Sequence, residues 1–216
     1  MSVFIILMSL STLFMSVWLY LMRDRFSYKT YAIIPLAILH VVYGVVSVRI
    51  FAFAEKGFHS VNKGAMSLFG AVFLLPLLFY IDSRILKCKP QKVFDIFTVG
   101  MIFSVLCARI NCIIAGCCKG IMFFGTEHRW PTREIEVIFY LILMEIFVYR
   151  IRKDKTKGEI YPVYMISYGV LRFILEFIRE SDQTGIFHRA HYWSALSVLI
   201  GVVALLVVKK RDYKGV

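Results

Sequence analysis

Residues Ser2–Met22 read SVFIILMSLSTLFMSVWLYLM, a stretch without a charged side chain. About 20 apolar residues are enough for a helix to cross the hydrocarbon core of a bilayer. No basic segment precedes this stretch, so we expect a retained membrane anchor rather than a cleavable signal peptide. Six more apolar runs follow, at Tyr31–Ala54, Gly64–Ile81, Val93–Cys118, Ile135–Tyr149, Ile160–Ile178 and Tyr192–Val208. We therefore expect an all-α integral membrane bundle of seven transmembrane helices, with one polytopic domain over residues 1–216 and a short fifth span that extends into its flanks.

The composition agrees with a membrane protein. Hydrophobic residues make up 59% of the 216 residues, and the mean hydropathy is +0.72, whereas soluble domains are about 45–50% apolar. The formal net charge of +12 does not form a basic stripe or a nucleic-acid recognition module. The basic residues lie instead in short clusters between apolar runs, as in loops that face anionic lipid. We therefore expect no nucleic-acid partner.

Lys and Arg residues concentrate in alternate connections between the predicted spans. Sixteen of the 26 fall in the first, third and fifth connections and in the C-terminal tail, seven fall in the other connections, and three lie inside spans. Positive charge accumulates on the cytoplasmic side of membrane proteins. The pattern therefore predicts a multi-pass protein of the cell (plasma) membrane with its N-terminus outside and its C-terminus in the cytoplasm.

The three basic residues inside predicted spans are Arg49, Arg109 and Arg172. A charge at membrane depth costs at least about 2.5–3.5 kcal/mol on insertion scales, so it usually faces a partner, a cavity or a ligand. In the predicted orientation all three lie in the outer halves of their spans, at the level of Gly70 and Glu136. The sequence therefore predicts a site just beneath the outer surface, which faces the outer leaflet.

Helical spacing places the polar residues of the sixth span on one face. Tyr168, Arg172, Glu176 and Arg179 stand at i, i+4, i+8 and i+11, and Arg172 and Glu176 are spaced to pair. One interpretation is a structural ion pair inside the membrane. The other is an anion-binding face, because arginine binds phosphate through two parallel hydrogen bonds and phospholipid phosphate is the abundant anion there.

The fourth span carries a second polar face. Arg109, Cys112 and Gly116 stand at i, i+3 and i+7 and are predicted to share it. Glu136 is the only good carboxylate candidate at the same depth for the remaining arginines. A surplus of buried positive charge is then expected, which favours an anionic ligand over ion pairing alone.

The residues of the sixth span also form a longer pattern, YGVLRFILEFIR at Tyr168–Arg179. It resembles the late-span signature of the prolipoprotein diacylglyceryl transferase family at every fixed position. Three earlier segments are similar to other motifs of that family: SLFGA at Ser67–Ala71, ARINCIIAGCCKG at Ala108–Gly120 and WPTREIE at Trp130–Glu136. The order, the spacing and the predicted seven spans agree with it, from about Gly64 to the end of the chain.

The resemblance implies a transferase that moves a diacylglyceryl group from phosphatidylglycerol to a cysteine thiol of a prolipoprotein at the outer leaflet. It implies catalytic roles for Arg109, Arg172 and Glu136. Substrate-binding roles are implied for a larger set: Arg133, Tyr168, Glu176, Arg179, Gly70 and Cys112. The expected partners are phosphatidylglycerol and a prolipoprotein or another thiol acceptor, and no cofactor or metal is expected.

Four positions depart from the family motifs. The chain has Phe69 where the family has His, Cys112 where it has Asn, Cys117 where it has Glu, and Arg133 where it has Gln. An alternative function therefore stays open, that of a non-catalytic or altered-acceptor relative that binds anionic phospholipid or a thiol-containing partner. The candidates for the general base that a thiol acceptor needs are Glu136, His128, His188 and His191.

The cysteines and two histidines allow a further interpretation. Cys117 and Cys118, with Cys112 nearby, have the residue types of a redox or soft-metal site, although small residues that pack a helix end are commoner. His188 and His191 have the spacing of a zinc pair, but the sequence shows no third ligand near them, so an interfacial pair is expected. His40 is expected to be satisfied by the polar groups around it.

Overall fold

The computed structural model describes all residues except 1, 26–29, 57–65, 124–127, 181–184 and 214–216. In the described part, seven α-helices hold nearly all the regular structure: α1 (Ser2–Leu21), α2 (Ile33–Lys56), α3 (Phe69–Ile85), α4 (Pro90–Ile114), α5 (Thr132–Arg152), α6 (Ile160–Glu176) and α7 (Arg189–Tyr213). Two short 3-10 helices, Arg23–Arg25 and Thr30–Ala32, stand before α2. The chain divides into two compact units, Met1–Val105 and Leu106–Val216, with the boundary inside α4.

In the first unit, α1 packs along the first part of α4 through a few specific contacts. The Trp18 indole Nε1 donates a hydrogen bond to the Ile96 carbonyl oxygen (2.9 Å), and Ser11 and Ser104 share one of 2.5 Å. Between them the rings of Phe14 and Phe103 stack with their centroids 4.0 Å apart. Polar groups that bond across helices in this way hold helices together where lipid offers no hydrophobic driving force.

Helices α2 and α3 of the same unit pack closely around two features. A side chain at Gly70 would collide with the Ser47 carbonyl oxygen and lie 2.8 Å from the Phe51 Cβ atom. Further along, His40 Nε2 lies 2.8 Å from Asp82 Oδ2, and His40 Nδ1 donates to the Leu36 carbonyl oxygen at 2.7 Å. Both side chains are almost fully buried. The expectation that polar groups satisfy His40 is confirmed.

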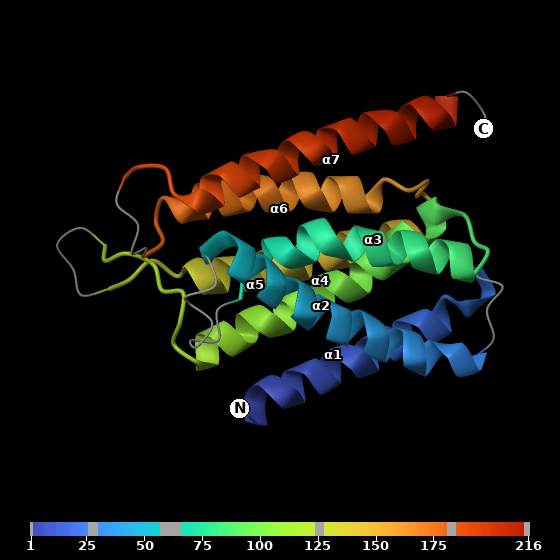
Figure 1. The fold of residues 1–216 in the computed structure, drawn as a ribbon, viewed down its shortest axis with the longest axis horizontal. Coiled ribbons are helices and arrows are strands. Elements are labelled where there is room, and N and C mark those ends of the chain that lie inside the picture. Colours follow the sequence, from blue (N-terminus) through green and yellow to red (C-terminus); the bar gives the residue numbers. More distant parts are fainter. Residues whose placement is uncertain (1, 26–29, 57–65, 124–127, 181–184, 214–216) are drawn as a thin grey trace. The chain divides into compact units, whose positions relative to one another are not determined.

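In the second unit, α6 and α7 run side by side (Figure 1, orange and red). Small residues bring the two backbones together. A Cβ at Gly169 would lie 2.7 Å from the Ser194 carbonyl oxygen, and one at Gly201 would lie 2.8 Å from Ile166 Cγ1. The Ser197 hydroxyl donates to the Met165 carbonyl oxygen at 2.9 Å. Small and hydroxyl-bearing residues at a helix interface are typical of helices that associate in a membrane.

Each of the seven predicted apolar runs corresponds to one helix in the described residues, with shifted ends. The predicted start of the third run, Gly64, lies outside the described residues. The fifth helix extends into both flanks, as predicted, whereas α4 ends four residues before the predicted Cys118 and α6 ends two before Ile178.

Four of the helical segments are long and apolar enough to cross a membrane: Val3–Leu21, Thr30–Glu55, Pro90–Ile114 and Arg189–Arg211. Helices α3 and α6 are shorter, with 17 residues each, and α5 carries several charged residues. The described chain is therefore all-helical with four candidate membrane spans. Seven spans and the orientation of the termini stay predictions.

Candidate functional site

The end of helix α4 brings two predicted site cysteines together. The amide of Gly116 donates to the Ile113 carbonyl (3.2 Å) and that of Cys117 to the Cys112 carbonyl (3.2 Å). Gly116 has a φ of 69°. These are the two hydrogen bonds and the left-handed residue of a Schellman motif, in which the residue after the glycine packs back on the last full turn. Cys117 therefore lies over Cys112. Gly116 itself lies beyond the helix, so the prediction that it shares a helical face with Arg109 was wrong.

The loop that follows is fastened to the first turn of α5. Cys118 adopts the left-handed region as well, with a φ of 59°, and its carbonyl accepts a hydrogen bond from the Thr132 hydroxyl at 3.3 Å. The Arg133 guanidinium reaches the carbonyl oxygens of Cys112 and Cys117 at 3.5 and 3.4 Å. The backbone around all three cysteines is thus held in place by residues of α5.

The same loop also pairs with the end of α6. The Ile121 amide donates to the Ile178 carbonyl (2.9 Å), and the Glu180 amide donates to the Lys119 carbonyl (3.0 Å). Gly120 and Arg179 form an isolated bridge between these hydrogen bonds. Because α6 ends at Glu176, Arg179 is not on its helical face, and that prediction was wrong. The bridge places Arg179 instead beside the loop that follows α4 and contains Cys117 and Cys118, called the cysteine loop below.

Two buried ion pairs form the interior of the site. Arg109 on α4 lies 2.9 Å from Glu136 on α5, and within α6 Arg172 lies 2.7 Å from Glu176. All four side chains are at least 90% buried. The pairing expected for Arg172 and Glu176 from their spacing is confirmed, and Glu136 is the partner of Arg109.

These pairs correct the expectation of surplus charge. The predicted surplus counted Arg49, Arg109 and Arg172, but the last two have carboxylate partners and Arg49 is exposed in the first unit. The positive charge that remains comes from Arg179, which has no carboxylate within 4.0 Å among the residues that the structure describes, whereas Arg133 is 3.5 Å from Glu134.

Two pKa shifts reflect this charge. Burial, and after it the neighbouring Arg172 cation, lower the pKa of the Arg179 guanidinium. The pKa of the Cys118 thiol is also lowered, first by a hydrogen bond with the Cys112 thiol and then by the cations of Arg179 and Arg109. The cations thus contribute to both shifts, after burial for Arg179 and after the hydrogen bond with Cys112 for Cys118.

Several buried polar atoms of this unit have no hydrogen-bond partner among the described residues. Among them are the Arg109 Nε atom and the hydroxyls of Tyr140 and Tyr164. Buried polar groups in folded proteins are nearly always paired, so these atoms are candidates for contact with a ligand. Tyr168 is buried in the same helix as Tyr164, and their rings stack with centroids 5.9 Å apart. Sequence reasoning missed Tyr140, although it stands one helical turn after Glu136.

The candidate bases have different surroundings. Glu136 is engaged with Arg109. His188 Nδ1 lies 3.7 Å from Glu176, and the His188 amide donates to Nδ1 of the buried His191 at 2.9 Å. His128 is exposed. His188 and His191 therefore form a polar cluster with Glu176, a carboxylate that the sequence did not place beside them.

Gly70 and Phe69 belong to the first unit. Phe69 is buried and its ring lies among those of Phe51 and Phe73. The close approach of α2 accounts for a glycine at position 70 without a substrate, because any side chain there would strike the backbone at Ser47.

Comparison with known proteins places the chain in a family. The family model described as prolipoprotein diacylglyceryl transferase matches residues 2–207. The chain belongs to the prolipoprotein diacylglyceryl transferase family. Similar relatives are phosphatidylglycerol–prolipoprotein diacylglyceryl transferases of Dehalococcoides mccartyi, 22% identical over 97% of this chain and 89% of the relative, and of Clostridium tetani, 24% identical over 67% and 64%. That of Finegoldia magna is 26% identical over 72% and 66%. Membership in the prolipoprotein diacylglyceryl transferase family makes this multi-helix chain an enzyme of the diacylglyceryl transferase type.

Proposed function

We propose that this protein transfers a diacylglyceryl group from phosphatidylglycerol to a cysteine thiol of a prolipoprotein. The names of its relatives supply the reaction. The observation that carries the proposal at the residue level is Arg179, which has no carboxylate within 4.0 Å among the described residues and lies near the buried pairs of Arg109 with Glu136 and Arg172 with Glu176. This arrangement suits a phosphorylated, anionic substrate.

The reaction is a displacement at carbon. The acceptor thiolate forms a carbon–sulfur bond with the glyceryl carbon next to the phosphate, and the carbon–oxygen bond to the phosphate breaks. The electron pair of that bond leaves with glycerol phosphate. Because negative charge grows on the leaving oxygen, guanidinium groups directed at the phosphate lower the barrier. We assign this role to Arg109 and Arg172, and we assign to Glu136 the orientation of Arg109.

The remaining predicted residues bind the substrate in this proposal. Arg179 and Arg133, on the loop side of the ion pairs, attract the anionic headgroup. Glu176 fixes the plane of the Arg172 guanidinium, as its 2.7 Å contact suggests. Tyr168 and Cys112 line the same region. Gly70 contributes only by allowing α2 and α3 to approach each other.

We further propose that both units form one membrane domain with seven spans, the N-terminus outside and the site open to the outer leaflet of the plasma membrane. Three observations support this arrangement: four helices meet the length and hydropathy of a span, the charges alternate between connections, and the family's named substrate, phosphatidylglycerol, is a membrane lipid.

A labelling experiment tests the orientation. In protein whose native cysteines are replaced by serine, Ile186→Cys is expected to react with a membrane-impermeant maleimide added to intact cells, and Lys155→Cys is not. Both positions are exposed, so permeabilised cells should label both and serve as the control. Labelling of Lys155→Cys but not Ile186→Cys in intact cells would invert the charge argument.

A transfer assay tests the reaction itself. Purified protein, phosphatidylglycerol labelled in an acyl chain and a peptide carrying a prolipoprotein cleavage-site cysteine are expected to yield labelled peptide. The same peptide with serine in place of cysteine should stay unlabelled, because a serine hydroxyl is a far weaker nucleophile than a thiolate. Binding of the lipid without any label on the peptide would contradict the proposal and favour a non-catalytic lipid-binding relative.

A further inference from the structure

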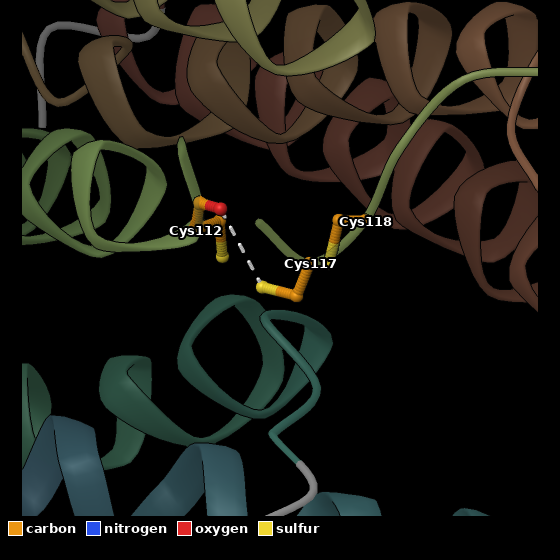
Figure 2. A group of neighbouring side chains, drawn as sticks. All are labelled: Cys112, Cys117 and Cys118. Carbon is orange, nitrogen blue, oxygen red and sulfur yellow. Dashed lines mark hydrogen bonds between the residues drawn. The ribbon is translucent and has the colours of Figure 1, made fainter. Parts of the chain in front are cut away.

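Three cysteine sulfurs gather at the end of helix α4. The Sγ atoms of Cys112, Cys117 and Cys118 all lie within 4.8 Å of one another. Figure 2 shows the three side chains, with the Cys117 thiol directed at the Cys112 carbonyl oxygen, which is 3.7 Å away. The Schellman turn brings Cys117 over Cys112. The left-handed backbone of Cys118 then turns the Cys118 side chain back toward the other two cysteines. The backbone thus arranges three sulfur ligands around one point.

We propose that Cys112, Cys117 and Cys118 bind one zinc ion through their thiolates and leave its fourth coordination position open for the thiol of the acceptor. The inference rests on the proposed function for the identity of the acceptor, but not for the metal site. It adopts the soft-metal interpretation that the sequence left as an alternative.

The residue types and their spacing suit zinc. Thiolates select zinc and other soft ions, and zinc binds four ligands tetrahedrally with zinc–sulfur distances of about 2.3 Å, which places the sulfurs roughly 3.8 Å apart. The sulfurs lie within 4.8 Å of one another, so none of their separations exceeds that spacing by more than about 1 Å. The carbonyls of the three cysteines are already held by Thr132 and Arg133, so the loop is ordered before an ion arrives.

Residues around the cysteines offset the negative charge of a zinc–thiolate site, and the exposure of the cysteines leaves the metal accessible to an acceptor. Three thiolates around Zn²⁺ carry a net charge of −1, and a fourth thiolate raises it to −2. Arg179 forms a backbone bridge with Gly120 of the same loop, and Arg133 contacts two of the cysteine carbonyls. Cys117 is exposed and the other two are partly exposed. Structural zinc sites are closed by four protein ligands, whereas sites with three ligands and an accessible position bind a substrate or water.

An open position would activate the acceptor. A thiol that coordinates zinc is deprotonated, and its proton passes to solvent. The zinc-bound sulfur then attacks the glyceryl carbon, a carbon–sulfur bond forms, and glycerol phosphate departs with the electrons of the carbon–oxygen bond. Zinc is neither oxidised nor reduced in this step. The protein then needs no general base for the thiol, and Glu136 stays engaged with Arg109.

Metal binding is tested with cobalt(II) and zinc on the purified, reduced full-length protein without lipid. One equivalent of cobalt is expected to give the sulfur-to-cobalt charge-transfer absorption and the visible bands of a tetrahedral site, both of which zinc abolishes. Cys118→Ser and Cys117→Ser should each weaken zinc binding by at least about 100-fold, above the effect typical of an outer-sphere partner. Cys88→Ser is the matched control, since this free cysteine lies outside the cluster, and it should bind like the parent protein.

The acceptor is tested on the cobalt-loaded protein. Adding the cysteine peptide is expected to increase the charge-transfer absorption, because a fourth sulfur joins the metal, and the serine peptide should not change it. No metal binding beyond that of Cys118→Ser, or formation of a disulfide within the cluster instead, would overturn the site. Metal binding without any response to the cysteine peptide would overturn the open position. If metal and peptide bind but no label is transferred from phosphatidylglycerol, the inference stands and the proposed transferase function falls.

Discussion

Replacing Arg172 by lysine is expected to lower the transfer of diacylglyceryl from phosphatidylglycerol by at least about 100-fold, the size of effect seen when one donor to a developing anion is removed. The formal charge does not change. A guanidinium binds phosphate through two parallel hydrogen bonds in a fixed plane, whereas an ammonium is a point charge on a flexible stem. The measurement is the initial rate of peptide labelling with Arg172→Lys protein that matches the parent in yield and thermal unfolding.

The contact between Arg172 and Glu176, 2.7 Å in the structure, supplies the control. Glu176→Gln leaves a buried arginine without its carboxylate, so it is expected to reduce yield and thermal stability more than Arg172→Lys does. In Arg172→Lys the lysine can still pair with Glu176. Near-normal transfer by well-folded Arg172→Lys protein would therefore mean that the pair is structural and that Arg172 does not bind the phosphate.

Replacing His40 by alanine is expected to destabilise the protein by about 3–5 kcal/mol, because it removes a buried ring and leaves a buried polar group without its partner. The substitution leaves Asp82 buried without the imidazole that now lies 2.8 Å from it. It also removes ring contacts with Phe97 and Phe79, whose centroids are 4.5 and 5.7 Å from that of His40. The free energy of unfolding in detergent micelles, measured by denaturant titration, checks the prediction.

The double variant His40→Leu with Asp82→Leu is the control for this pair. Removing both polar partners and replacing them by apolar side chains is often neutral or stabilising, because no buried charge is left alone. The double variant is therefore expected to recover most of the lost stability. If His40→Ala costs less than about 1 kcal/mol, a value typical of an exposed pair, the contact does not hold α2 against α3.

The positions of the helices could be predicted from the sequence, because apolar runs long enough to cross a bilayer are a strong signal for a helix. The residues at which the helices end were predicted less accurately. The apolar run of α4 continues to Cys118, but Gly116 adopts a left-handed conformation that ends the helix. The sequence shows that glycine, and a terminating glycine after an apolar run was a usable signal.

Contacts between distant segments account for the rest of the site. The pairing of Arg172 with Glu176 follows from their spacing on one helix, and Glu136 was the one carboxylate expected near the remaining arginines. The place of Arg179 depends on the bridge between residues 119–121 and 178–180. No local pattern encodes that bridge, because the two segments are far apart in the chain and each is too short to show a period.

The cysteine loop has a backbone whose path depends little on the side chains it presents. Its turns are fixed by Gly116, and its carbonyls are held by the side chains of Thr132 and Arg133. Side chains at positions 112, 117 and 118 can therefore be exchanged while the loop keeps its course, and asparagine at 118 would suit the left-handed conformation better than cysteine does. If the loop binds a metal and an acceptor as proposed, different side chains at these three positions would change its chemistry while the fold stays the same.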